Sequence, residues 1–293
     1  MIIIKITHLS IAKWAIIKIS LNFMYKFVTF FYFVTFLFLS FNSFSMEQSK
    51  IESLFLAIKK KNREKVQEIL KSGVNINLEL FNQTALMKAC DIGDAEIVQL
   101  LVDYPGININ FQNFIGTSAL TFASYCDHIE VLKILLDQPN IKLNQSSTDV
   151  DQTLPGITAI FKAALQKNYI SVKLLAAAGA DIAKIKQSEA IEAAKDGQEI
   201  CEQIFQAGSN GDINQIKNFV KSGFSLNARD FLNNTPLHYA VVFNDKCMII
   251  TLLGYNPKLI CSKNNHNLTP IELALESDEW GVITLFLNLA YIS

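Results

Sequence analysis

Residues 235–240 read Thr235-Pro236-Leu237-His238-Tyr239-Ala240, and this hexapeptide indicates the fold most directly. Related hexapeptides begin with Thr or Ser, carry Leu or Ile in third place and end in Ala; they occupy residues 84–89, 118–123, 158–163 and 269–274. The copies that start at residues 84 and 118 are 34 residues apart, as are those at 235 and 269, whereas 40 residues separate 118 from 158. Self-similarity at a spacing of about 20–50 residues indicates a repeat architecture.

Each repeated unit predicts a pair of antiparallel helices. The Thr or Ser caps the first helix by accepting hydrogen bonds from free backbone N–H groups, and a Pro after it fits the first helical position. A second apolar pair follows in each unit, for example Leu100-Leu101 or Leu252-Leu253. One such unit cannot bury its apolar face alone, so stacked neighbours have to complete the core.

This pattern resembles the ankyrin repeat, and the resemblance extends over residues 50–290. Residues 235–240 match the hexapeptide of that family in full, and residues 93–101 and 127–136 match its second-helix pattern. The resemblance implies an all-α solenoid of helix-turn-helix units with short β-hairpin-like turns. Residues 50–80 and 199–230 lack the hexapeptide and have the character of first repeats, so we expect about seven repeats in two consecutive arrays.

The expected organisation has four parts. A leader covers residues 1–45, a first array of about four repeats covers 46–182, a helical connector rich in Lys, Glu and Ala covers 183–198, and a second array of about three repeats covers 199–293. Residues 145–153 account for the 40-residue step and are expected to form a polar extended finger.

The leader carries an apolar run from Phe27 to Leu39, preceded by Lys26 and followed by small residues at Ser43 and Ser45. A basic start, a short apolar core and a small-residue site are typical of a secretory signal, which predicts cleavage before Met46 and export to a periplasm or to the medium. The alternative is an uncleaved single-pass anchor over residues 27–44. Residues 1–23 do not fit a signal, so Met24 is a candidate for the true start.

The charge balance of the chain excludes one class of protein. The leader holds four Lys and no acidic residue, so from Met46 onward 22 Lys and Arg face 27 Asp and Glu, a net charge of −5. This balance excludes a strongly basic nucleic-acid-binding protein. The abundance of Phe, Ile, Lys and Asn is a compositional sign of an AT-rich genome, as in host-associated bacteria.

The histidines, the cysteines and the motifs of the sequence predict no catalytic or metal site. The resemblance assigns His238 and His128 to structural hydrogen bonding within and between repeats, and His266 lies on a turn tip. The five Cys form no CxxC motif and have no Cys–His spacing that suits zinc. No nucleotide-binding, metalloprotease or hydrolase motif is present, so we expect no cofactor; an enzyme, or an adaptor for one, is the less favoured alternative.

What remains is a binding surface. In ankyrin repeats, contacts come from turn tips and from the exposed face of the first helix of each repeat, which line a concave groove. Carried onto this sequence, the turn tips are Phe81, Asn82, Phe114, Ile115, Phe231, Leu232 and His266, and the helix-face positions are Phe122, Tyr125, Tyr239 and Phe243. Exposed aromatic side chains favour recognition of another protein, and we expect the chain to act as a monomer. The alternative is that these side chains pack between neighbouring repeats.

Overall fold

The computed structural model describes residues 46–148, 155–183, 185–186 and 188–290. The expected leader, and the tip of the expected finger at residues 149–153, lie outside the described residues. Contacts divide the chain into two units, residues 1–52 and 53–293. The described part of the first unit is helical, and all further statements concern the second. Within the described residues no helix combines the length and the apolar character needed to cross a membrane.

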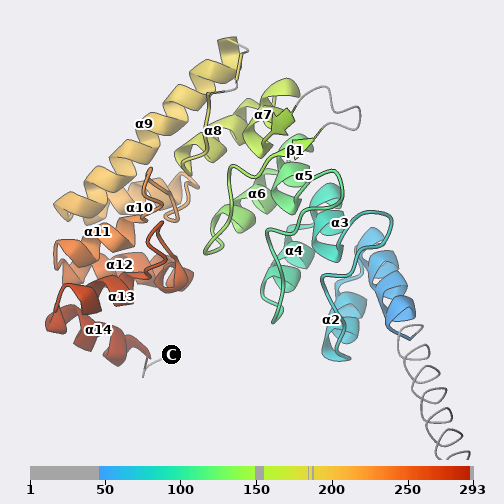
Figure 1. Cartoon of the computed structure of the whole chain (residues 1–293), viewed down its shortest axis with the longest axis horizontal. Helices are drawn as coiled ribbons and strands as arrows, with labels where there is room; N and C mark the ends of the chain where they lie inside the picture. Colours follow the sequence, from blue (N-terminus) through green and yellow to red (C-terminus); the bar gives the residue numbers. More distant parts are fainter. Residues whose placement is uncertain (1–45, 149–154, 184, 187, 291–293) are drawn as a thin grey trace, which may run out of the picture. The chain divides into compact units, whose positions relative to one another are not determined.

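The described part of the second unit consists almost entirely of helices joined by turns (Figure 1). After helical residues 53–59, the elements are α2 (Arg63–Lys71), α3 (Ala85–Ile92), α4 (Ala95–Val102), α5 (Ala119–Tyr125), α6 (Ile129–Leu136), β1 (Ser147–Thr148), β2 (Pro155–Ile157), α7 (Ala159–Leu165), α8 (Tyr169–Ala177), α9 (Ser188–Asn210), α10 (Ile213–Lys221), α11 (Pro236–Val242), α12 (Lys246–Tyr255), the 3-10 helix η1 (Pro257–Cys261), α13 (Pro270–Glu276) and α14 (Trp280–Ala290). The predicted all-α helix-turn-helix solenoid is confirmed.

The hexapeptides at Thr84, Ser118 and Thr269 start their helices through the expected cap, whereas the Thr158 hydroxyl makes no cap hydrogen bond. The Thr84 hydroxyl accepts a hydrogen bond from the N–H of Met87 at the start of α3, and Pro236 and Pro270 occupy the first positions of α11 and α13. Aspartates cap α4, α10 and α12 in the same way; for example, the carboxylate of Asp94 accepts from the N–H of Ile97. Such caps satisfy backbone donors that have no partner inside the helix.

Asparagine side chains connect successive turns. The amide of Asn77 donates to the carbonyl of Gly106 (2.8 Å) and accepts from the N–H of Asn108 (2.8 Å). The amide of Asn110 repeats the arrangement one unit later, with the carbonyl of Asn140 (2.9 Å) and the N–H of Lys142 (2.8 Å). Each of these side chains therefore holds the backbone of the following turn at two points.

Helix α9 is the longest described helix of the second unit and runs without a break through the expected boundary at residues 198 and 199. It packs along α8, where Gly197 approaches the carbonyl of Lys173 and a Cβ added to the glycine would lie 2.7 Å from that of Ala176. Its other half packs against α10 and α11. The helix thus joins the α2–α8 stack to the α9–α14 stack.

A short hairpin interrupts the helical pattern between α6 and α7. Strands β1 and β2 pair antiparallel, with Ser147 opposite Ile157, and the hydroxyl of Ser147 donates to the carbonyl of Ile157 (3.1 Å). These strands form the base of the finger that the 40-residue step predicts.

Candidate interaction surfaces

Three aromatic turn tips point their side chains into solvent. Phe81, Phe114 and Phe231 are 89%, 83% and 86% exposed. A large apolar side chain so fully exposed contributes little to the core, because folding removes almost none of its surface from water. The packing alternative therefore does not hold for these three residues in the described chain.

The turn that carries Phe81 is strained. Leu80 and Gln83 exchange two backbone hydrogen bonds (2.8 and 3.1 Å), so only Phe81 and Asn82 form the bend. Both residues are left-handed, with φ of +51° and +61°. Asn adopts this region readily, whereas a bulky residue does so at a cost of about 1–2 kcal/mol. Phe81 thus combines backbone strain with almost complete exposure.

Hydrogen bonds between neighbouring turns hold the tips in place. The side chain of Asn113 donates to the carbonyl of Asn82 (3.1 Å), and the N–H of Phe114 donates back to the side chain of Asn82 (3.4 Å). Near the C-terminal end, the side chain of Asn265 donates to the carbonyl of Phe231 (3.2 Å). Ile115 is half-buried, and Leu232 and His266 are exposed.

The four predicted helix-face residues divide into two groups. Tyr125 and Phe243 are exposed, whereas Phe122 and Tyr239 are half-buried. The ring of Tyr239 packs edge-on against Phe205 at a centroid distance of 5.5 Å, and its hydroxyl donates to Asp230 (2.7 Å). Contacts inside the molecule therefore explain the partial burial of the Tyr239 side chain. The assignment of all four residues to partner binding stays a prediction.

The histidines of the repeats have structural roles, as expected. Nδ1 of His238 accepts from the N–H of Thr235 (3.0 Å), so its Nε2 carries the proton that bonds to the carbonyl of Leu268 (3.2 Å). Burial lowers the pKa of His238 to about 4, since a charged imidazolium would be poorly solvated there. Nε2 of His128 lies 3.1 Å from the carbonyl of Asp91, and its ring leaves no room for a Cβ at Gly93.

Burial raises the pKa of three of the five thiols, whereas Cys247 and Cys261 are exposed. Cys90 is fully buried, and burial raises its pKa far above the usual range. Burial also raises the pKa of Cys201 to about 12, and burial together with the nearby Asp91 raises that of Cys126. A protonated thiol is a poor nucleophile and a poor metal ligand. No group of three or more potential metal ligands occurs in the part of the chain that the structure describes.

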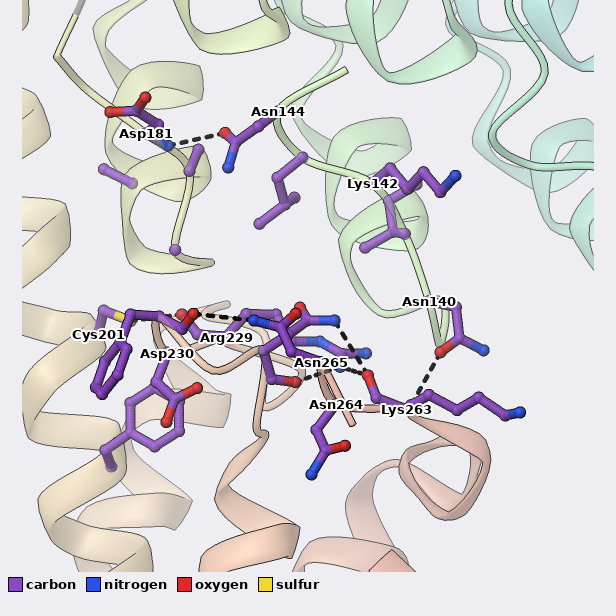
Figure 2. A pocket seen from close by; sticks show the side chains of 18 of the residues that line it. Asn140, Lys142, Asn144, Asp181, Cys201, Arg229, Asp230, Lys263, Asn264 and Asn265 are labelled. Atoms are coloured by element: carbon purple, nitrogen blue, oxygen red, sulfur yellow. Dashed lines mark hydrogen bonds between the residues drawn. The ribbon is translucent and has the colours of Figure 1, made fainter. Parts of the chain in front are cut away.

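The structure also contains a cavity that the sequence analysis missed. Its volume is about 1070 Å³, and it lies between residues 140–145, the turn after α8, one face of α9 and the turns at 229–233 and 263–267 (Figure 2). No sequence motif marks it, because its walls come from segments up to 127 residues apart (from Asn140 to Asn267). Of the predicted site residues, only Phe231 lines it.

Arg229 holds two turns of the cavity wall together. This side chain is only 5% exposed, and its guanidinium donates to the carbonyls of Asn233 (2.9 Å) and Lys263 (3.0 Å) and to the side chain of Asn227 (3.0 Å). Burial lowers its pKa to about 10, which still leaves it charged at neutral pH. Its backbone N–H donates to the carbonyl of Ala178 (3.0 Å), which connects the wall to the end of α8.

Comparison with known proteins identifies the repeats. Residues 54–147 match the family model for ankyrin repeats (3 copies). The chain is 36% identical over 93 residues to the DNA replication inhibitor plutonium of Drosophila melanogaster, a match that covers 31% of this chain and 48% of that protein.

Two further relatives match shorter shares of their own length. The chain is 27% identical over 191 residues to an L-asparaginase of Dirofilaria immitis, covering 64% of this chain and 29% of that protein. It is 40% identical over 77 residues to the probable E3 ubiquitin-protein ligase XBOS32 of Oryza sativa subsp. japonica, covering 26% and 15%. The chain thus spans less than half the length of each relative, and their activities are not carried over to it.

The class of protein follows from the fold and the turns together: a helix-turn-helix repeat solenoid whose turn tips present side chains to solvent. The matched residues supply the family: residues 54–147 are ankyrin repeats. Ankyrin repeats support a role as a protein–protein interaction module, because stacked repeats present an extended binding surface.

Proposed function

We propose that this protein binds a partner protein, as a monomer and without catalysis, through its aromatic turn tips and the exposed face of its first helices. The observation that carries the proposal is Phe81, which is 89% exposed and left-handed. Strained residues of this kind persist where function retains them. Phe114, on the next turn, is tied to Asn82 and offers a second ring.

The surface suits recognition because it is ordered before the partner arrives. The turn tips are fixed by hydrogen bonds between turns. Helix α5, which carries Tyr125, and helix α11, which ends just before Phe243, are packed into the solenoid. Binding to a pre-ordered surface avoids the entropy cost of ordering loops. Aromatic anchors commonly carry most of the binding free energy of an interface.

The absence of catalysis is supported by the state of the reactive groups. The imidazole of His238 is held by two hydrogen bonds and stays neutral, and the thiols of Cys90 and Cys201 stay protonated. A nucleophile requires an adjacent base or a lowered pKa, and none of these residues has either.

Binding is tested by replacing two tips together, Phe81→Ala with Phe114→Ala, and cross-linking the purified chain to partners in an extract of the producing cell. We expect the double variant to lose capture of a partner that the unaltered chain enriches, by about tenfold or more, since anchor residues often contribute over 1.4 kcal/mol. The control is Ile170→Ala, which removes an exposed apolar side chain on α8 instead. Unchanged capture with unchanged thermal melting would contradict the proposal.

We further propose that the protein is exported, with the apolar run at residues 27–39 as the core of a cleaved signal, and anchoring by residues 27–44 as the alternative. The test is mass spectrometry of the N-terminus in fractionated native cells. A soluble chain that begins at Met46 supports export, whereas a membrane-bound chain that begins at Met24 or Met1 supports the anchor and overturns cleavage.

A further inference from the structure

The cavity between the α2–α8 stack and the α9–α14 stack has a rigid frame. The side chain of Asn144 accepts from the N–H of Asp181 (2.9 Å), and the side chain of Asn140 accepts from the N–H of Lys263 (2.9 Å), as Figure 2 shows. The buried guanidinium of Arg229 donates to the carbonyl of Lys263 and so holds that turn in place. The first bond joins two segments of the α2–α8 stack, and the second joins that stack to the α9–α14 stack, so both define the space between them.

The lining of the cavity is rich in amides and balanced in charge. Eight of its 22 described lining residues are Asn or Gln, and three bases face three acids. The bases are Lys142, Arg229 and Lys263, and the acids are Asp181, Glu202 and Asp230. Such a lining does not favour a polyanion or a polycation. It suits a ligand that presents hydrogen-bond donors and acceptors in alternation along its length.

The chain itself shows what its asparagine side chains bind. Asn77, Asn110 and Asn140 each hold backbone at two points, by donating to one carbonyl and accepting from the N–H two residues later. Asn144 makes only half of this clamp, because within the described residues its Nδ2 donates to nothing. Gln198 on α9 lines the same cavity, and its exposed amide has no partner there either.

Covalent and metal chemistry are not supported in this space. Cys201 lies on the wall, but its thiol stays protonated because burial raises its pKa to about 12. Asp230 is already occupied by the hydroxyl of Tyr239 and the N–H of Asn234 (both 2.7 Å). The groups left for a ligand include the amides of Asn144 and Gln198, the ammonium of Lys142 and the carboxylate of Glu202. Two buried lining atoms, Oε1 of Gln145 and Nε of Arg229, also have no hydrogen-bond partner within the described residues.

We propose that this cavity binds an extended segment of a partner polypeptide, with Asn144 and Gln198 pairing to its backbone C=O and N–H groups. The site rests on the proposed function in that its ligand is a protein, but it uses a surface separate from Phe81 and Phe114. Extended peptides gain affinity from main-chain hydrogen bonds to a preformed edge, and specificity from the side-chain pockets beside it. A carbohydrate is the other ligand class that an amide-rich cavity could hold, and the test distinguishes the two.

The test uses the full chain, immobilised and panned against a displayed library of short random linear peptides. Peptides that are enriched are then synthesised, and their Kd values are measured by fluorescence polarisation against the unaltered chain and four variants. Gln198→Trp fills the cavity, and Lys195→Trp places the same ring elsewhere on α9, outside the lining. Asn144→Leu removes the side-chain amide that is expected to bind the peptide backbone, and Phe81→Ala removes the aromatic ring of a turn tip.

Support for the cavity site is loss of binding in Gln198→Trp and about tenfold weaker binding in Asn144→Leu, with Lys195→Trp and Phe81→Ala unchanged. Equal affinity of Gln198→Trp and Lys195→Trp overturns it. Peptides that lose binding only in Phe81→Ala overturn the cavity site and leave the proposed function standing. If no peptide is enriched, or if a glycan array gives binding that Gln198→Trp abolishes, the peptide assignment is wrong. Circular dichroism melting checks that each variant is folded.

Discussion

At the scale of single residues, two side chains show how local environment and stability are coupled. Phe81 is exposed and left-handed, and its hydrophobic ring gains almost nothing from folding. His238 is the opposite case, since its ring is buried and both of its nitrogens are hydrogen-bonded. The first residue lowers stability at every pH, and the second makes stability depend on pH.

Replacing Phe81 by Gly is expected to stabilise the fold by about 1 kcal/mol, because Gly adopts a left-handed φ without steric cost. The measurement is the urea midpoint of unfolding followed by circular dichroism. Phe114→Gly is the matched control, since it also removes an exposed ring but Phe114 is not left-handed. A fall in the midpoint for both variants would show that Phe81 is not strained.

Lowering the pH from about 6.5 to about 4 is expected to reduce stability through His238 by about 3 kcal/mol. The folded pKa is about 4, below the unfolded value near 6.5, so the unfolded chain takes up a proton in this window and the folded chain does not. The contribution of His238 to the free energy of unfolding is fully present above about pH 6.5 and is lost as the pH falls to about 4.

The control for His238 is His238→Gln, in which an amide can make the same capping contacts without titrating. The free energy of unfolding is measured by urea titration at several pH values for both proteins. The expected result is that the difference between the two proteins changes across the window. A constant difference would mean that His238 titrates normally when folded.

At the scale of elements, α9 shows how tertiary packing overrides helix propensity. Gly197 sits in the middle of a helix, where Ala would ordinarily be favoured by about 1 kcal/mol. It is tolerated because α8 and α9 approach so closely there that a Cβ would lie 2.7 Å from that of Ala176. The glycine therefore sets the contact between the two stacks of helices.

Gly197→Ala is expected to destabilise the protein by about 1–3 kcal/mol through this overlap. Gly254→Ala is the matched control, because Gly254 also lies in a helix, α12, and a Cβ there meets nothing within 4 Å. This second variant is expected to stabilise slightly, as propensity alone predicts. Thermal melting of both variants compares them directly, and equal shifts would refute close packing at Gly197.

At the scale of the molecule, within residues 53–293, the α2–α8 and α9–α14 stacks are joined by polar contacts between turns. The amide of Asn140 donates to the carbonyl of Cys261 (3.2 Å) and accepts from the N–H of Lys263 (2.9 Å). The ammonium of Lys258 bonds to Asp103 (2.7 Å) and to the side chain of Gln138 (3.0 Å). The bond between Asn140 and Lys263 frames the cavity, and all four bonds join residues more than a hundred positions apart.

Asn140→Ala is expected to loosen this junction locally. The N–H of Lys263 loses its acceptor, so its hydrogen exchange is expected to accelerate by about tenfold, which corresponds to one lost hydrogen bond of about 1.4 kcal/mol. Hydrogen-exchange mass spectrometry over residues 255–270 measures this. Asn218→Ala, on the exposed side of α10, is the control. Unchanged exchange at Lys263 in both variants would show that the bond does not hold the junction.

The repeat, the helix starts at Thr84, Thr235 and Thr269, and the structural role of His238 could all be predicted from the sequence. These features arise from contacts within a unit or between neighbouring units. They therefore recur at a spacing of about 34 residues and can be recognised from it. The sequence also placed aromatic residues on turn tips, but the strain at Phe81 became visible only with the backbone of its turn.

Tertiary structure alone decided the rest. The unbroken course of α9, the close approach at Gly197 and the pairing of Asn140 with Lys263 follow from packing between segments that no local pattern connects. The cavity is a consequence of that packing. Its amide side chains are ordinary turn residues in the sequence, and they form a site only because the α9–α14 stack packs against the turns of the α2–α8 stack.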